Sequence, residues 1–209
     1  MADRDGAVAN ELLLALLVFV LVTLFTPGPN NAMLMTTGLN FGFRRGQPHL
    51  WGVALGFAVM VLAVGLGLGA VFAAYPIVYA VLKYAGAAYL LYLAWQIATA
   101  GPVAGSEAAG GRPMSFLEAA AFQWLNPKGW VMAVGAVSTY AAVSTFPFNV
   151  VLMAFLFGSL GVLSSATWLG FGTGLKRLLT SPRAVRAVNI AMALLLVASL
   201  WPIVSEGWR

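Results

Sequence analysis

The feature that most constrains this chain is a series of long apolar stretches separated by short polar connections. There are six of them, at roughly residues 12–39, 50–74, 77–99, 115–142, 148–175 and 185–204. A helix needs about 20 apolar residues to cross the hydrocarbon core of a bilayer. The stretches are continuous and do not alternate between apolar and polar residues, which argues against the strands of a membrane barrel. The pattern predicts an all-α membrane protein with six transmembrane helices.

Composition excludes the other broad classes. Of the 209 residues, 61% are hydrophobic and 8% are charged, whereas a soluble domain carries about 25% charged residues. A disordered chain would also be richer in charge. The net charge of +5 does not indicate a nucleic-acid partner, because the Lys and Arg residues lie at the ends of apolar stretches, where membrane topology explains them. The expected partner is therefore the lipid bilayer.

The basic residues predict an orientation. Six spans place both termini on one side of the membrane, together with Arg4, Lys83 and Arg209. The opposite side holds Arg44, Arg45, Arg112, Lys176, Arg177, Arg183 and Arg186. Because short cytoplasmic loops carry the excess of Lys and Arg, the termini are expected outside and the more basic loops in the cytoplasm.

Two of the six stretches are interrupted. The first and the fourth are each about 28 residues long, and they contain TPGPNN at residues 26–31 and QWLNPKG at residues 123–129. Proline removes a backbone donor and clashes with the preceding helical turn. Irregular backbone at membrane depth is tolerated only where it is packed in protein or faces a wet cavity. Helices one and four are therefore expected to be broken.

The interruptions also suggest an internal repeat, because Pro27 and Pro127 are 100 residues apart. We expect a single membrane domain over 1–209, with repeat one at about 12–99, a linker at about 100–114 and repeat two at about 115–204. Three spans is an odd number, so the second half would enter the membrane inverted. Paired interrupted spans in inverted repeats point to the binding site of a transporter. A non-transporting membrane assembly or chaperone subunit stays open as the alternative, since weak self-similarity and kinked helices also occur there.

Lys128 is the most informative side chain. It lies about 13 residues into the fourth stretch, which at 1.5 Å per residue is roughly 20 Å from the interface. A lysine at such depth costs on the order of 2.5–3.5 kcal/mol, and none of the six acidic residues lies at mid-span. Lys128 either offers its ammonium group to a substrate carboxylate or caps backbone carbonyls freed by the broken helices, and the two roles are compatible.

The polar residues around the breaks match both charges of an amino acid. A helix that restarts after Pro29 offers free N–H groups and a positive dipole end to a carboxylate, and unwound carbonyls before the breaks accept from an ammonium group. In the rival interpretation the amides merely satisfy freed backbone groups. The predicted substrate-binding residues are Thr26, Pro27, Gly28, Pro29, Asn30, Asn31, Gln123, Asn126, Pro127 and Lys128.

Other residues are assigned no chemistry. The glycine pairs Gly52/Gly56 and Gly170/Gly174 indicate close helix packing. His49, beside the arginines of a polar connection, is interpreted as part of a solvated helix start in preference to a proton relay. With one histidine, no cysteine and no carboxylate pair at depth, the chain has no parts for a metal site or an acid–base centre. We expect no cofactor, no metal and no enzymatic activity.

The motifs resemble the lysine exporter (LysE/RhtB) family of bacterial inner-membrane amino-acid exporters. The resemblance rests on TPGPN at residues 26–30, on KYAGAAYLLYL at 83–93 and on NPK at 126–128. Finer features, such as PNN at 29–31 and GFR at 42–44, look most like the branch that exports cysteine and O-acetylserine. The resemblance implies six spans and a secondary transporter that exports small amino acids or derivatives, coupled to protons or membrane potential.

The sequence departs from the family pattern at two positions. Some relatives carry an aspartate in span five just before a tryptophan, where this chain has Ser165 followed by Trp168. The glycine that usually precedes the tryptophan of span three is Ala94 here. Without an acidic residue at depth the proton carrier is not identified, and a homo-oligomer stays open.

Overall fold

The part of the protein that the structure describes is built from helices joined by short connections. The computed structural model describes residues 2–68, 74–99, 111–179 and 181–201, and no strand occurs in these ranges. The α-helices are α1 Ala2–Phe25, α2 Pro29–Phe41, α3 Gln47–Ala63, α5 Pro76–Thr99, α6 Phe116–Phe122, α7 Pro127–Thr139, α8 Phe148–Leu178 and α9 Pro182–Ala198. A π-helical turn, Val64–Leu68, extends α3. The expected linker at 100–114 and the chain beyond residue 201 lie largely outside the described residues.

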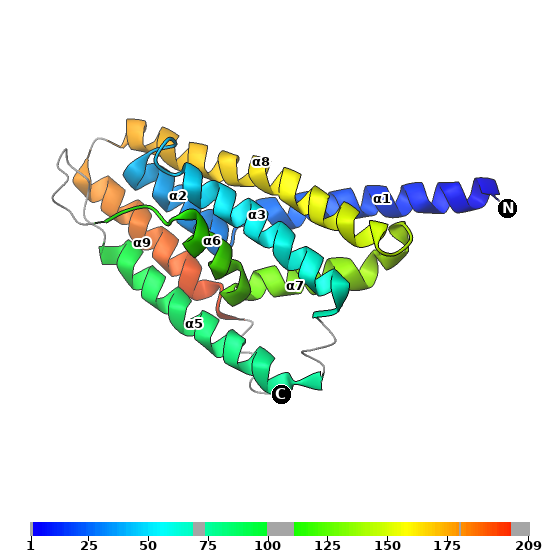
Figure 1. The fold of residues 1–209 in the computed structure, drawn as a ribbon. Coiled ribbons are helices and arrows are strands. Elements are labelled where there is room, and N and C mark those ends of the chain that lie inside the picture. Colours follow the sequence, from blue (N-terminus) through cyan, green and yellow to red (C-terminus); the bar gives the residue numbers. More distant parts are fainter. Residues whose placement is uncertain (1, 69–73, 100–110, 180, 202–209) are drawn as a thin grey trace.

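The helices run back and forth between two ends of the molecule (Figure 1). The ends of α2, α5 and α8 and the starts of α3, α6 and α9 lie together at one end. The long helix α8 packs against both α2 and α3, α3 packs against α6, and α5 packs against α9. Each of the six predicted apolar stretches thus contains one helix or one interrupted pair of helices.

Both predicted interruptions are present. Helix α1 ends at Phe25 and α2 begins at Pro29, and the two helices are bent by 51° relative to each other. The second interruption is a 3₁₀ turn, Gln123–Leu125, between α6 and α7. Proline stands in the first turn of both resumed helices, where its missing N–H has no helical acceptor in any case.

Glycines let two helix pairs, α2 with α8 and α3 with α6, approach to backbone contact. Gly38 on α2 lies against the backbone of Leu169 on α8, and Gly172 on α8 lies against the carbonyl of Met35. The predicted packing role of Gly52 and Gly56 is confirmed, because both lie on the backbone of α6. For Gly174 the prediction is wrong, since a Cβ atom there would meet nothing within 4 Å.

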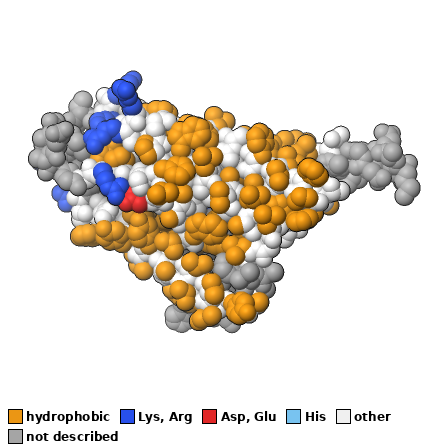
Figure 2. Space-filling view, viewed as in Figure 1, with side chains coloured by type: hydrophobic (Ala, Val, Ile, Leu, Met, Phe, Trp, Pro, Cys, Tyr) orange, Lys and Arg blue, Asp and Glu red, His pale blue; other side chains and the backbone are white. Residues whose placement is uncertain are grey.

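The surface carries apolar side chains along the helices and basic ones at one end (Figure 2). Large hydrophobic side chains are exposed on several helices, among them Leu14, Val81, Phe155 and Leu194. Length and apolarity qualify two of the described helical segments as membrane spans, Gln47–Leu68 and Phe148–Leu178, and the bent pair α1–α2 qualifies as a third when it is taken as one span. The remaining three predicted spans stay predictions.

The glycine contacts predict opposite effects of one substitution at two positions of α8. Gly172→Ala places a methyl group against the Met35 carbonyl, so we expect a loss of about 1–3 kcal/mol, the usual range for overpacking. Gly174→Ala meets no neighbour and is expected to stabilise the helix by up to about 1 kcal/mol. Thermal unfolding of the detergent-purified variants checks the sign. Equal stability of the two variants would contradict the packing described here.

Candidate functional site

Lys128 bridges the two broken helices. It is the second residue of α7, and its Nζ atom donates a hydrogen bond of 2.6 Å to the carbonyl of Thr26 in the first break. Gly28 makes room for the lysine stem, because a Cβ atom at residue 28 would come within 2.8 Å of Lys128 Cδ. The carbonyl-capping role predicted for Lys128 is therefore present in this conformation. The ammonium group has two further N–H donors available for a ligand.

A reciprocal amide pair joins the breaks at a second point. The Nδ2 atom of Asn30 donates to Oε1 of Gln123 at 2.8 Å, and Nε2 of Gln123 donates back to Oδ1 of Asn30 at 3.2 Å. Gln123 is fully buried and also donates to the carbonyl of Ala119 at 2.8 Å. The two amides, 93 positions apart in the chain, hold α2 and α6 together.

Asn31 and Asn126 satisfy backbone groups that the breaks leave unpaired. Nδ2 of Asn31 donates to the carbonyls of Leu24 and Thr26, both at 2.9 Å, and Oδ1 of Asn126 accepts from the backbone N–H of Lys128 at 3.1 Å. Helix α8 adds a donor that sequence reasoning missed, Ser164 Oγ, at 2.9 Å from the carbonyl of Leu24. In this conformation these two asparagines therefore satisfy backbone groups, as the rival interpretation expects.

The remaining predicted residues end or begin the helices at the two breaks. The hydroxyl of Thr26 donates to the carbonyl of Val22 at 2.5 Å, so Thr26 contributes its carbonyl to the site and keeps its hydroxyl within α1. Pro27 is exposed, whereas Pro29 and Pro127 begin α2 and α7. Gly28 precedes α2, and no side chain caps that helix. The N-terminus of α2 therefore faces Lys128 with uncapped N–H groups.

A cavity of about 30 Å³, called here the inner cavity, lies between the two breaks and helices α3 and α8. A buried water needs about 10–15 Å³ of such space, so the inner cavity is small in this conformation. Among the described residues that line it, Lys128 is the one that carries a charge. The lining residues are Thr23, Leu24, Gly28, Asn30, Asn31, Val53, Ala54, Phe57, Asn126, Lys128, Gly129, Met132, Phe157, Gly161, Ser164 and Ser165.

Sequence reasoning missed the wall of the inner cavity that faces the breaks. Phe57 on α3 and Phe157 on α8 are buried and pack edge to face, with their ring centroids 5.2 Å apart. Met132 on α7 completes this apolar side. These residues lie within otherwise apolar stretches, where no sequence signal distinguishes a cavity wall from ordinary core.

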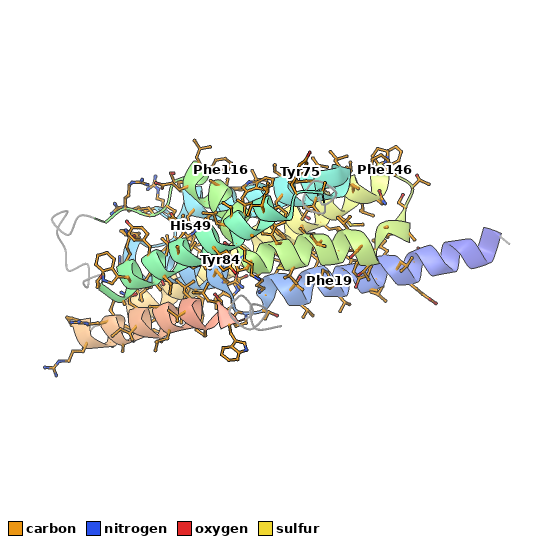
Figure 3. The ribbon with its side chains drawn as sticks, turned by 90° about the horizontal axis from the view of Figure 1, so that it is seen from below. Phe19, His49, Tyr75, Tyr84, Phe116 and Phe146 are labelled. Atoms are coloured by element: carbon orange, nitrogen blue, oxygen red, sulfur yellow. The ribbon has the colours of Figure 1, made fainter. Side chains whose placement is uncertain are left out.

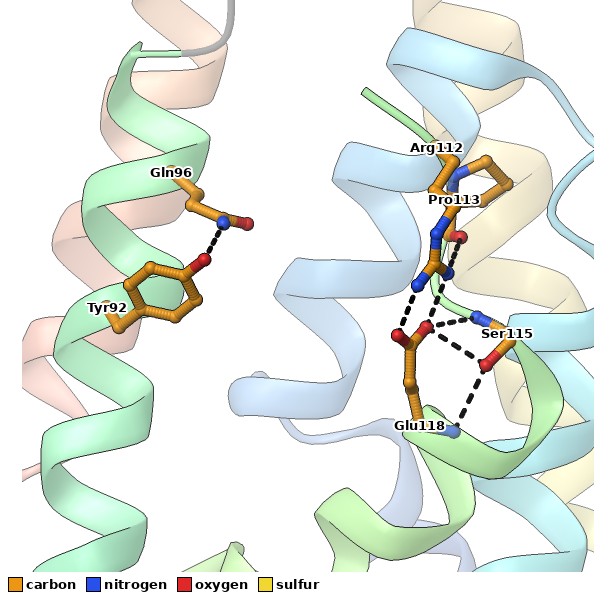
Figure 4. A network of polar contacts seen from close by, with 6 residues as sticks. All are labelled: Tyr92, Gln96, Arg112, Pro113, Ser115 and Glu118. Atoms are coloured by element: carbon orange, nitrogen blue, oxygen red, sulfur yellow. Dashed lines mark hydrogen bonds and ion pairs between the residues drawn. The ribbon is translucent and has the colours of Figure 1, made fainter. Parts of the chain in front are cut away.

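A larger cavity of about 610 Å³, called here the vestibule, lies at the basic end of the molecule. It is lined from α2, the start of α3, the second half of α5 and the segment that leads into α6. Figure 4 shows two polar groups of this lining, the hydrogen-bonded pair of Tyr92 and Gln96 on α5 and a network around Glu118. Both groups border the same space.

The network around Glu118 combines an ion pair with a helix cap. Arg112 contacts both carboxylate oxygens of Glu118, one of them through Nη1 at 2.6 Å. The backbone N–H and the hydroxyl of Ser115 donate to the same carboxylate at 2.8 and 2.9 Å, and the N–H of Glu118 donates back to the Ser115 hydroxyl. This capping box starts α6 and leaves Glu118 bound to Arg112 rather than to Lys128.

The interpretation of His49 as part of a solvated helix start is wrong. His49 is 1% exposed and lies among the helices (Figure 3). Its Nδ1 atom is 2.9 Å from the hydroxyl of Thr37, and its Nε2 atom has no hydrogen-bond partner within the described chain. The cause is the short connection between α2 and α3, which ends at Gly46 packed against Leu169 and Thr37 and so buries the first turn of α3.

Comparison with known proteins agrees with the resemblance seen in the sequence. A family model described as a LysE type translocator matches residues 21–199. Proteins named cysteine/O-acetylserine efflux protein from Escherichia coli strain K12 and from Shigella flexneri are each 35% identical over 188 residues, which cover 89% of this chain and 94% of each relative. No solved structure matches the chain. Because this family consists of translocators, the expectation that the chain is not an enzyme is confirmed: the chain belongs to the LysE family of transmembrane translocators.

Proposed function

We propose that this chain is a secondary exporter of small amino acids or their derivatives, of the size and polarity of cysteine and O-acetylserine. The observation that carries the proposal is the position of Lys128, which lines the inner cavity and meets the uncapped N-terminus of α2. An ammonium group and a helix N-terminus both favour a carboxylate. The efflux proteins named for these two substrates supply the chemical class.

The rest of the inner cavity suits the other parts of such a substrate. The carbonyl of Thr26, which now accepts from Lys128, is an acceptor for an α-ammonium group once Lys128 moves to the substrate carboxylate. Ser165 is buried in the lining and offers a hydroxyl to a polar substituent, while Phe57 and Met132 form an apolar side for its methylene or methyl groups. The substrate carboxylate would draw Lys128 away from Thr26.

We further propose the six-span architecture with two inverted repeats, 12–99 and 115–204, as the basis of alternating access. The paired interruptions support it, and so does the equal length of the resumed helices α2 and α7, which are both 13 residues long. The vestibule at the basic end corresponds to a cytoplasm-facing conformation under the positive-inside rule, with the termini outside. The bacterial inner membrane and coupling to protons or membrane potential are part of the same proposal.

A non-transporting assembly subunit is the second candidate, since the glycine contacts between α2 and α8 would serve it equally well. The polar residues that line the inner cavity favour transport. A lysine beside a small cavity contributes nothing to the packing of helices in an assembly. Counterflow in proteoliposomes against a panel of amino acids, with and without an imposed pH gradient, tests the choice. Exchange of cysteine or O-acetylserine supports the exporter, and failure to move any amino acid or derivative would reject it.

Replacing Lys128 is predicted to abolish most export. Lys128→Ala removes one charged hydrogen bond to the substrate, which is worth about 1.5–3 kcal/mol, so transport at low substrate concentration should fall about 10- to 100-fold. Lys176→Ala is the matched control, because Lys176 likewise donates to a backbone carbonyl, that of Asn40 in α2, at 3.1 Å, but does not line the inner cavity. Similar transport rates for both variants, at equal amounts of inserted protein, would contradict the site assignment.

The amide pair predicts strong coupling between two distant positions. Asn30→Ala and Gln123→Ala each leave one amide of the pair without its partner, whereas the double variant removes both. The effects of the single variants on thermal stability should therefore not add, with an interaction energy of about 0.5–3 kcal/mol in a double-mutant cycle. Asn31→Ala combined with Gln123→Ala serves as the control cycle, since Asn31 bonds only to the first break. Additive effects of Asn30→Ala and Gln123→Ala would be inconsistent with the pair.

A further inference from the structure

Helix α8 has one hydroxyl that is not used in any hydrogen bond. Its residues Ser159, Thr167 and Thr173 donate to the helix carbonyl four residues earlier, each at 2.8 Å, and Ser164 donates to the first break. The hydroxyl of Ser165 makes no hydrogen bond within the described chain. Its oxygen is therefore available to a ligand.

The free hydroxyl of Ser165 borders the inner cavity. Ser165 is 3% exposed and lines this cavity. Some polar side-chain atoms of the described chain are both unpaired and fully covered, and the Ser165 oxygen is not among them. An unpaired oxygen that is not covered meets open space, and the inner cavity is the space that Ser165 lines.

The other free polar groups of the inner cavity belong to the two breaks. The Asn126 amide is fixed by its Oδ1 atom, which accepts from the N–H of Lys128, and its Nδ2 atom is unpaired and uncovered. The Asn31 amide is fixed by its Nδ2 atom, and its Oδ1 atom is free in the same way. Together with Lys128 these groups suit the carboxylate and the ammonium group of an amino acid. Among the described lining residues, Ser165 is left for the side chain.

Ser165 ends a row of α8 residues that all line the inner cavity, after Phe157 and Gly161. Residues four apart share a helix face and are about 6 Å apart along the axis. Gly161 leaves space beside Ser165, because a Cβ atom at residue 161 would meet only Ala54, at 3.6 Å or more. Phe157 and its partner Phe57 add an apolar surface. The row thus offers a hydroxyl, room for a small group and an apolar wall.

We infer that Ser165 and Gly161 form the subsite for the substrate's side chain and select an acylated one, in which a carbonyl group carries a methyl group. This inference rests on the proposed function, which places the charged groups of the substrate at the breaks. The Ser165 hydroxyl donates to the carbonyl oxygen, and the methyl group lies over Gly161. The side chain of O-acetyl-L-serine has both groups. A sulfur atom is a weak acceptor, so cysteine gains less from Ser165.

Two amino acids of matched shape separate the two contributions. L-Homoleucine has a methyl group in place of the carbonyl oxygen, so it should bind about 2- to 10-fold more weakly than O-acetyl-L-serine, the net effect of one neutral hydrogen bond. L-Glutamine keeps the carbonyl but has an amide NH₂ in place of the methyl group. Against Phe57 and Phe157 these N–H donors find no acceptor, so L-glutamine should bind more weakly still.

Ligand-dependent thermal stabilisation of the detergent-purified chain measures these affinities without transport. A mildly acidic buffer keeps the acetyl group of the ligand on its oxygen. Ser165→Ala should raise the Kd of O-acetyl-L-serine about 2- to 10-fold and should not raise that of L-homoleucine. Ser159→Ala is the matched control, because it makes the same change on an exposed part of α8 outside the inner cavity, and both Kd values should stay unchanged.

Gly161→Ala tests the space beside Ser165. The added methyl group meets its nearest neighbour at an ordinary contact distance of 3.6 Å, so the variant should fold. It occupies the space assigned to the acetyl methyl group, and O-acetyl-L-serine should bind about 5-fold more weakly or worse, the usual effect of overpacking. L-Cysteine has no group to place there and should keep its affinity.

The outcomes for the subsite differ from those for the proposed function. Equal effects of Ser165→Ala on O-acetyl-L-serine and L-homoleucine, tighter binding of L-glutamine than of O-acetyl-L-serine, or no stabilisation of the wild-type chain by O-acetyl-L-serine overturns the inference. Selective binding without exchange in proteoliposomes would support the subsite and reject the exporter. Exchange of O-acetyl-L-serine with a preference that Ser165→Ala leaves unchanged would support the exporter and reject the subsite.

Discussion

The arrangement depends on the satisfaction of backbone groups where two helices are interrupted. Unpaired backbone groups are costly away from water, and each break leaves carbonyls without helical donors. Lys128 and Asn31 both donate to the carbonyl of Thr26, and Asn31 and Ser164 both donate to that of Leu24. Each carbonyl receives at least one donor from outside its own break. The first interruption is therefore stabilised by a donor from the second break, Lys128, and by one from α8, Ser164.

The need to satisfy the carbonyls of the break also explains how the proposed site could change conformation. Lys128 now satisfies a backbone carbonyl, and in the proposed mechanism a substrate that offers a carboxylate to Lys128 and an ammonium group to Thr26 would replace that contact with two others. The helices can then rearrange without leaving either group unpaired. The small inner cavity and the larger vestibule are consistent with a conformation that precedes this exchange.

The sequence predicted the elements that arise from local chemistry. Proline and glycine located both breaks, and the cost of a lysine at depth selected Lys128. The pairing of Asn30 with Gln123 and the walls formed by Phe57 and Phe157 depend on which faces of distant helices meet, and a single sequence does not contain that information. The error at His49 has the same origin, because a short polar connection does not show that the next helical turn is buried. The vestibule was not foreseen, since its walls come from four separate segments.

An experimental structure determined with bound O-acetyl-L-serine tests the central claim most directly. We expect the carboxylate of the ligand within hydrogen-bond distance of Lys128 Nζ and of the N-terminus of α2, with the contact between Lys128 and the Thr26 carbonyl released and the inner cavity enlarged. A ligand bound elsewhere, with Lys128 still on Thr26 and the breaks unchanged, would contradict the claim that the paired interruptions form the substrate site.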